Sequence, residues 1–312
     1  MKYRRDEMGN KLALTGITNN PGRVFVRCIS ENYNEVSRFF PGGLRAVYRS
    51  VSNVKDFERL LPNAEKCICD LTDFEGLKIA FKDIDVVFHI AGIHWSREVF
   101  EAAAYCGVRR IVTVHTCGIY SKYKAAGEEY RQIDDYCYKI CKENGIDLTI
   151  LRPTMIYGNR RDRNVIKFIK MIDKLPIMPV VNGGRYTVQP VHYEDLGKAF
   201  YDVLCHEKET ANKDFILSGK EPILLRDMFT EIGKNLGKKV HFISCPFWLA
   251  YPGAWLVYIF TLTKIDFREK VQRLCENRSY PHNEATEAFG YNPMSFHDGI
   301  VNEVLEYGEK SK

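Results

Sequence analysis

Short apolar runs rich in β-branched residues alternate with helical patterns throughout the first half of this 312-residue chain. The alternation predicts strands at 11–16, 44–49, 66–69, 85–90, 110–115 and 147–152, with helices near 22–30, 53–61, 74–81, 95–106 and 128–144. Strands that follow helices over short connections form a mostly parallel sheet with both faces covered. The predicted fold class is therefore α/β, a doubly wound parallel sheet with a smaller carboxy-terminal α/β region.

The composition argues against several classes of protein. Lysine and arginine number 45 and aspartate and glutamate 40, a net charge of +5 with the basic residues scattered, which predicts no nucleic-acid partner and leaves anionic small molecules. The 10 cysteines show no Cys-x-x-Cys or Cys/His spacing, so we expect no metal site and a reduced, cytoplasmic setting. The charged start leads into no signal-peptide core, so secretion is not expected.

Residues 12–25 indicate a strand, a tight turn of small residues and a helix. Gly16 and Gly22 bracket the turn, and Asn19 stands where a Gly-x-x-Gly-x-x-Gly fingerprint has its middle glycine. Such a turn gathers backbone N–H groups and the positive end of a helix dipole at one point, which suits a dinucleotide pyrophosphate. By itself the pattern also fits an ordinary strand-to-helix turn.

Two later strands end in motifs that fit the same cofactor. The third is followed by Asp70-Leu71-Thr72-Asp73. Asp70 suits either an adenine amino group or the cap of the next helix, a role that Asp73 would fill equally well. The fourth strand ends in Ala91-Gly92, small residues that let the backbone approach a cofactor closely.

Further motifs follow in the second half of the chain. Thr116 comes after the fifth strand, and the later segments are Leu151-Arg152-Pro153-Thr154-Met155-Ile156-Tyr157-Gly158, Gln189-Pro190-Val191-His192-Tyr193-Glu194-Asp195-Leu196 and Gly290-Tyr291-Asn292-Pro293. In this order and spacing the set resembles the short-chain dehydrogenase/reductase superfamily, in its extended and atypical branches of NAD-dependent epimerase/dehydratase-like proteins. The resemblance implies an NAD(P)-binding Rossmann domain at 1–157, with returning segments near 185–215, and a mainly substrate-binding region at 158–312.

The resemblance also implies a nicotinamide cofactor across the carboxyl ends of the first and fourth strands. Val47-Tyr48-Arg49-Ser50 ends the second strand without the acid that would bind the adenosine ribose. Arg49, with Arg23, is suited to hold a 2′-phosphate bidentately, so NADP is favoured over NAD. The candidate cofactor-binding residues are Thr15, Gly16, Asn19, Gly22, Arg23, Arg49, Asp70, Leu71, Ala91, Gly92, Pro153, Thr154, Met155 and Ile156.

The catalytic pattern departs from that of the superfamily, whose active members carry Tyr-x-x-x-Lys on the helix after the fifth strand. The matching stretch here begins at Tyr130 and has Asp134 in place of the lysine. A carboxylate would raise the pKa of a neighbouring tyrosine, so the usual role of the pair does not carry over. Tyr120 and Lys124 form another such pair, in the loop after the strand, and Thr116 is placed to orient a substrate oxygen. We therefore take Thr116, Tyr130, Tyr120 and Lys124 as the catalytic candidates.

The loop Asn159-Arg160-Arg161-Asp162-Arg163-Asn164 corresponds to a substrate-facing loop in extended members. Arg160, Arg161 and Arg163 suit the diphosphate of a nucleotide sugar, or pair with Asp162 in solvent, and Gln189 and His192 are further substrate candidates. The predicted function is hydride transfer on a sugar-nucleotide or lipid-linked sugar by an epimerase/dehydratase-like or reductase enzyme. The alternative is a non-catalytic NAD(P)H-binding sensor or assembly protein, similar to the reductase-like accessory subunit of respiratory complex I.

Residues 245–263 contain no charged side chain. The stretch approaches the length of a membrane span, but Pro252-Gly253 interrupts the helix and Trp and Tyr residues punctuate it, which argues against a span. We expect a helix pair buried in the substrate region, or else a peripheral contact with a bilayer or a partner subunit. The expected location is accordingly cytoplasmic, with membrane association left open.

Overall fold

The computed structural model describes residues 10–309. Seven parallel strands form its central sheet in the order β11-β6-β5-β4-β1-β2-β3. Chain order reverses beside β1, which lies between β2 and β4, and such a reversal opens a crevice at the carboxyl ends of the strands. The strands are β1 Leu12–Thr15, β2 Leu44–Tyr48, β3 Glu65–Ile68, β4 Val86–His89, β5 Arg110–Val114, β6 Asp147–Pro153 and β11 Lys213–Leu217.

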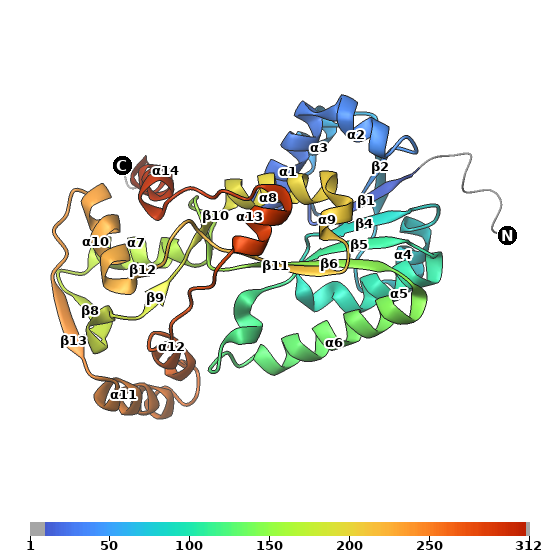
Figure 1. Ribbon diagram of the computed structural model, residues 1–312. Helices are drawn as coiled ribbons and strands as arrows, with labels where there is room; N and C mark the ends of the chain where they lie inside the picture. Colours follow the sequence, from blue (N-terminus) through green and yellow to red (C-terminus); the bar gives the residue numbers. More distant parts are fainter. Residues whose placement is uncertain (1–9, 310–312) are drawn as a thin grey trace.

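Helices cover both faces of the sheet (Figure 1). One face carries α1 Asn20–Glu31, α2 Tyr33–Phe39, α3 Lys55–Leu60, α8 Tyr193–Cys205, α9 Glu207–Thr210 and α13 Asn283–Phe289, and the other α4 Phe74–Ala80, α5 Ser96–Cys106 and α6 Gly127–Asn144. Side chains alternate along a strand, so Leu12 and Leu14 pack in the core with Phe25 and Phe200, while Ala13 packs in the opposite core. The α/β doubly wound prediction is confirmed.

The strands and helices predicted in the first half are all present, with ends shifted by one or two residues. The element that the periodicity missed is α2 Tyr33–Phe39, a short helix that buries only Val36. A helix with a single buried residue has no repeating pattern of apolar residues by which the sequence could reveal it.

A second region packs against the carboxyl ends of the sheet (Figure 1). Its core lies among α7 Val165–Lys174, α10 Leu225–Asn235 and α14 Phe296–Glu309. Three separate two-stranded pairs lie outside the central sheet: β7 Ile156–Tyr157 with β10 Val191–His192, β9 Thr187–Val188 with β12 Ile223–Leu224, and β8 Met178–Val181 with β13 Phe242–Cys245. The remaining elements are η1 Ile93–Trp95, η2 Cys117–Tyr120, η3 Asn182–Gly184, α11 Phe247–Phe260 and α12 Arg268–Arg273.

Most of the apolar stretch at 245–263 forms one continuous helix, α11 Phe247–Phe260, with Pro252 inside it. The prediction of an interrupted, buried helix pair is wrong. An interior proline removes one N–H bond and crowds the carbonyl four residues earlier, but here the helix continues through it. Only Ala254 of α11 is buried, because the core of this region is filled by other elements and contains no α11 residue. None of the described helices has the length and apolarity needed to cross a membrane.

Candidate active site

The turn after β1 brings the backbone of two strands into close contact. Gly16 has φ +75°, and a β-carbon added there would lie 2.5 Å from the backbone nitrogen of Ala91. A β-carbon on Gly22 would lie 2.3 Å from the carbonyl oxygen of Gly16. Asn19 accepts a hydrogen bond from the Gly22 N–H at 2.7 Å and donates one to the Ile90 carbonyl at 3.1 Å. The Asn19 side chain therefore connects the loop to the end of β4 by hydrogen bonds, which a glycine at this position could not make.

Thr15 and His89 lie side by side beneath this turn and are fully buried. The His89 ring donates from Nε2 to the Gly92 carbonyl at 3.2 Å, so Nδ1 accepts from the Thr15 hydroxyl at 2.7 Å. Burial lowers the pKa of His89 to about 3, which keeps the ring neutral. Thr15 therefore supports the loop through His89, and its hydroxyl is already engaged.

Three charged candidates lie around the ends of β2 and β3. Arg23 donates to the Thr18 carbonyl and pairs with Asp56 at 2.7 Å, whereas exposed Arg49 makes no hydrogen bond or ion pair with the described residues. Asp70 accepts from the Thr72 N–H and hydroxyl, and these bonds, with a smaller contribution from Arg49, lower its pKa. The helix cap that Asp70 might have formed belongs to Asp73, which accepts from the Gly76 N–H at 3.0 Å.

A cavity of about 870 Å³ lies where the sheet meets the second region. Thr116, Tyr130 and Pro153 line the side nearest the sheet, and α7, β8, α11 and α12 form the rest of its wall. Parallel strands in register end at one edge, so the turn after β1, Thr116 after β5 and Pro153 at the end of β6 share that edge. The cavity therefore adjoins the crevice in which a dinucleotide is expected.

Comparison with known proteins gives the class of cofactor. Residues 42–173 match a family model described as NAD(P)H-binding. The chain has an NAD(P)-binding Rossmann domain. Cinnamoyl-CoA reductase 1 from Arabidopsis thaliana is 23% identical over 205 residues, a match that spans 49% of the chain and only 54% of that relative.

Solved structures with the same fold span nearly the whole chain. A dTDP-glucose 4,6-dehydratase from Streptomyces venezuelae, determined with NAD bound, has a TM-score of 0.72 and 16% identity and covers 96% of this chain and 97% of its own. An NADPH-dependent quinone oxidoreductase from Escherichia coli has a TM-score of 0.69 and 15% identity over 95% of this chain and 99% of its own. Identity this low shows a shared fold and leaves the substrate open.

The predicted cofactor residues at the end of β6 do not all face the same space. Pro153, Thr154 and Met155 line the cavity, while Ile156 lies in β7 outside it and Leu71 is half-buried against the core. The strand ends that carry the other predicted cofactor residues lie at one edge of the sheet, and their role in cofactor binding stays a prediction.

Two catalytic candidates converge on Gly118 in η2. A β-carbon on Gly118 would lie 3.2 Å from both Thr116 Oγ1 and Tyr130 Cε2. Thr116 Oγ1 accepts from the Gly118 N–H at 2.9 Å, which leaves the Thr116 hydroxyl proton for another acceptor. Burial, and then the nearby Glu129 carboxylate, raises the pKa of Tyr130 above its usual value of 10.

The other tyrosine–lysine pair does not meet in the cavity. Tyr120 packs its ring against Tyr280 at 5.4 Å and is not among the lining residues, whereas Lys124 lines the cavity and lies 3.5 Å from Glu269. The two side chains therefore do not form the proton-transfer couple that their spacing suggested. The structure favours Tyr130 over Tyr120.

Asp134 points away from Tyr130 into the sheet. Its two carboxylate oxygens accept from His115 Nδ1 and from Arg152, both at 2.6 Å, and Arg152 also pairs with Asp214. His115 Nε2 also lies within hydrogen-bond distance of the Ser96 hydroxyl, at 3.0 Å, and burial lowers the pKa of His115, which favours the neutral ring. Asp134 is not among the groups that raise the pKa of Tyr130, so the expected effect of this carboxylate on the tyrosine is wrong. Its actual role is to clamp α6 to β5 and β6.

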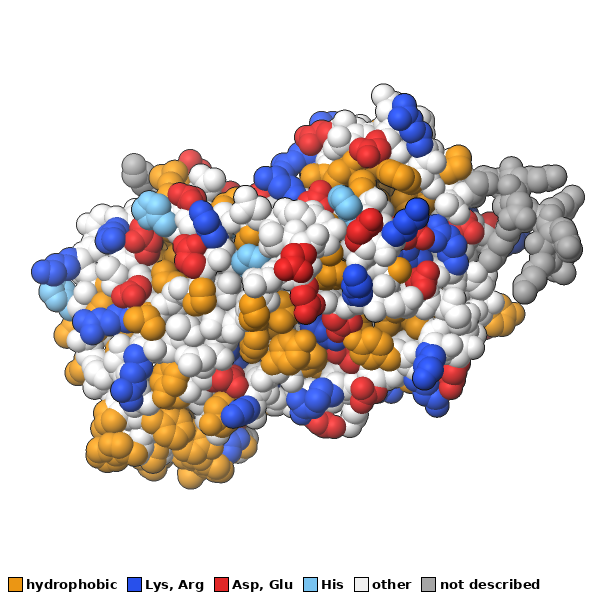
Figure 2. Space-filling view, viewed as in Figure 1, with side chains coloured by type: hydrophobic (Ala, Val, Ile, Leu, Met, Phe, Trp, Pro, Cys, Tyr) orange, Lys and Arg blue, Asp and Glu red, His pale blue; other side chains and the backbone are white. Residues whose placement is uncertain are grey.

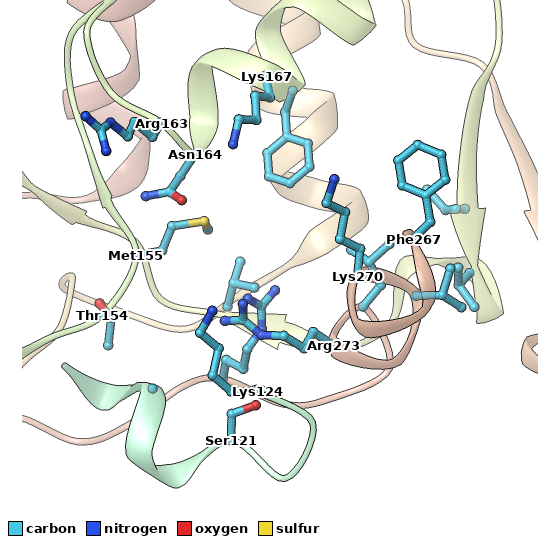
Figure 3. A pocket seen from close by; sticks show the side chains of 18 of the residues that line it. Ser121, Lys124, Thr154, Met155, Arg163, Asn164, Lys167, Phe267, Lys270 and Arg273 are labelled. Atoms are coloured by element: carbon cyan, nitrogen blue, oxygen red, sulfur yellow. The ribbon is translucent and has the colours of Figure 1, made fainter. Parts of the chain in front are cut away.

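The charged side chains that line the cavity are all cations: Lys124, Arg163, Lys167, Lys270, Arg273 and Arg278. Figure 3 shows Lys124, Lys167 and Arg273 reaching into the same space from different elements. The Nε atoms of Arg273 and Arg278 are buried without a hydrogen-bond partner among the described residues. Burial, together with Arg273 beside it, lowers the pKa of Arg278 to about 10. Buried donors without partners are costly, so this end of the cavity is suited to an anion.

Most of the predicted substrate residues lie elsewhere. Arg163 reaches the cavity, but Arg160 and Arg161 are exposed in the loop and are not among its lining residues. Gln189 is buried, donates to the Gly219 carbonyl at 2.7 Å and accepts from the Tyr280 N–H at 3.0 Å, so its amide is fully engaged. His192 caps α8 and is buried beside Gly158, outside the cavity. Neither side chain reaches the cavity, because Gln189 holds the Gly219 and Tyr280 backbones and His192 caps α8.

Lys167, Lys270, Arg273 and Arg278 are the site residues that sequence reasoning missed. They lie on α7, on α12 and in the segment after α12, far from any motif. A lysine or arginine on an amphipathic helix looks the same in sequence whether it faces solvent or a cavity. No signal in the chain marked them.

Proposed function

We propose that the chain is an NAD(P)H-dependent oxidoreductase that reduces a carbonyl, or oxidises the matching alcohol, on a substrate that carries phosphate. The observation that carries the proposal is the convergence of Thr116 and Tyr130 on one cavity at the nicotinamide end of the NAD(P)-binding domain. When bound, the cofactor supplies or accepts the hydride. The chain itself binds the substrate, orients its oxygen and moves one proton.

Each role follows from a contact or a pKa. The Thr116 hydroxyl, held from the Gly118 N–H, donates a hydrogen bond to the substrate oxygen. Tyr130 keeps its proton at neutral pH because its pKa is raised, so in the reductive direction it donates that proton to the oxygen as the carbon receives hydride. In the oxidative direction the Tyr130 phenolate, which has lost its proton, takes the proton of the substrate alcohol as the hydride leaves the carbon.

The phosphate requirement rests on the cationic lining. Arg273 and Arg278 offer buried N–H donors that lack partners, and Lys124 shares the neighbouring Glu269 with Arg273. The dTDP-glucose of the structural neighbour and the CoA thioester of the curated relative differ in their reactive carbon but share a phosphate group. Sugar-nucleotide, lipid-linked sugar phosphate and acyl-CoA substrates all satisfy this chemistry.

Charge removal in the cavity tests the proposal. The Arg278→Gln variant should bind UDP and CoA about tenfold or more weakly, because a charge-assisted hydrogen bond contributes about 1.5–3 kcal/mol. Arg226→Gln, a surface arginine on α10 that lies over Phe242 outside the cavity, is the matched control. Calorimetric titration gives both affinities. Unchanged affinity in Arg278→Gln would contradict the anion site, and NADPH binding without turnover of any phosphate-bearing carbonyl would favour the sensor alternative.

A preference for NADP over NAD is expected from Arg49. In Arg49→Glu we expect NADPH binding to weaken by about 1.5–3 kcal/mol, since a charge-assisted contact to the 2′-phosphate is lost, with little change for NADH. Arg38→Glu, which changes an exposed arginine on α2 in the same way, is the control. Equal losses for the two cofactors in titration calorimetry would rule out a 2′-phosphate contact.

A further inference from the structure

The outward side of α11 is an exposed apolar surface. Trp248 is 74% exposed, Phe260 81% and Leu262, just beyond the helix, 77%. Figure 2 shows hydrophobic side chains gathered over α11 at the lower left of the molecule. Together with the similarly exposed Leu249, Trp255, Leu256 and Ile259, these residues make up what we call the α11 outer face. A contiguous apolar surface of this kind marks an interaction site.

The opposite side of the same helix lines the cavity. Ala250, Gly253, Ala254 and Val257 are lining residues, at the three- and four-residue spacing of one helix face. Val257 both lines the cavity and is 37% exposed, and the same holds for Met171 on α7 and Phe267 before α12, at 37% and 41%. The cavity therefore opens through an apolar rim beside the α11 outer face.

Charges border this surface on one side. Lys264 is exposed and makes no ion pair with the described residues, and Lys270 lies over the Phe267 ring at 4.8 Å. Arg268 stacks over Trp255 at 4.2 Å, and its carboxylate partner is Asp266. The border thus keeps an excess of cations beside amphipathic rings. Trp and Tyr rings with lysine and arginine beside them are the side chains that anchor a segment at a membrane interface.

We infer that the α11 outer face docks on the surface of a bilayer that contains anionic lipid, and that the substrate is a phosphate-linked lipid drawn from it. The 14 residues of α11 span about 21 Å, short of the roughly 30 Å of a hydrocarbon core, so the helix lies along the surface. The lipid tail leaves the cavity between Val257, Met171 and Phe267, and its phosphate reaches Arg273 and Arg278. The substrate part of this inference rests on the proposed function, and the docking part stands without it.

Vesicle sedimentation tests the docking. The full chain should sediment with phosphatidylcholine vesicles that contain phosphatidylserine, and less with phosphatidylcholine alone. The double variant Phe260→Glu/Leu262→Glu should lose at least tenfold in vesicle affinity, because two carboxylates enter the apolar contact. Ile79→Glu is the matched control, since Ile79 is 73% exposed on α4 at the other end of the molecule. Equal sedimentation with and without vesicles overturns the inference.

Further measurements separate the possible failures. Thermal melting and NADPH titration of the double variant should match the wild type, since neither changed residue lies in the core or the cavity. A wild-type dimer that dissociates in the double variant, seen by light scattering, would assign the face to a second copy and overturn the docking. A lipid-linked sugar phosphate is then added to the same vesicles. Vesicle binding without hydride transfer to or from this lipid would contradict the substrate class. Hydride transfer to soluble sugar nucleotides without vesicle binding would support the proposed function and contradict the docking on a bilayer.

Discussion

In Tyr130→Phe, kcat for hydride transfer is expected to fall by about 10²–10⁴-fold, with the Kd for NADPH unchanged. The phenylalanine keeps the ring beside Thr116 and Gly118 but has no proton to give to the substrate oxygen. The measurement is transfer of deuterium from labelled NADPH to product under single-turnover conditions. Tyr120→Phe is the matched control, because Tyr120 lies outside the cavity lining, and it should leave kcat close to that of the wild type.

The pH profile gives a second readout for Tyr130. Its pKa is raised in the folded protein, mainly by burial, so the hydroxyl stays protonated through neutral pH. The reductive rate should therefore be flat there and fall only as the pH rises above about 10. A falling limb that begins near neutral pH and persists in Tyr130→Phe would show that another group donates the proton, with Lys124 a candidate in the lining.

Asp134→Ala is expected to lower the free energy of unfolding by about 3–5 kcal/mol, as measured by urea denaturation. The substitution leaves His115 Nδ1 without its acceptor and takes one of two carboxylate partners from Arg152, all inside the protein. Asp135→Ala, at the exposed neighbouring position, should change stability by no more than about 0.5 kcal/mol. Similar losses at the two positions would show that the Asp134 network contributes little.

The effect should depend on pH in a defined direction. The pKa of Asp134 is lowered by His115 and Arg152 despite the opposing effect of burial. The stabilisation is therefore fully present above the unfolded-state pKa of about 3.9, and it is lost as the pH falls through the lower folded-state value. The difference in the free energy of unfolding between wild type and Asp134→Ala should accordingly be largest at neutral pH.

Asp134→Lys, which would restore a Tyr-x-x-x-Lys motif, places a cation beside Arg152 and should unfold the chain.

The fold could be predicted from sequence because its signals are local. Strands such as Leu12–Thr15 and Arg110–Val114 are buried on both faces, so most of their residues are apolar or β-branched and the strands can be recognised in the sequence. The first turn was predictable for the same reason, since Gly16 and Gly22 are needed where a β-carbon would collide with nearby backbone. The strand order then brought Thr15, Arg49, Asp70 and Ala91 to one edge without any long-range information in the motifs themselves.

Only the tertiary structure decided how individual polar side chains are used. From the sequence, Asp134 stands at the place of a catalytic lysine and Gln189 is a substrate candidate. In the structure both side chains are buried, and their hydrogen bonds join elements that are distant in sequence. Arg273 and Arg278 look like surface cations and instead face a cavity. Periodicity shows which face of a segment is apolar. The hydrogen-bond partner of a polar side chain depends on which distant segment packs beside it, and no local pattern contains that information. The apolar α11 shows the converse limit, because its sequence predicts burial while the finished core leaves its outer face exposed.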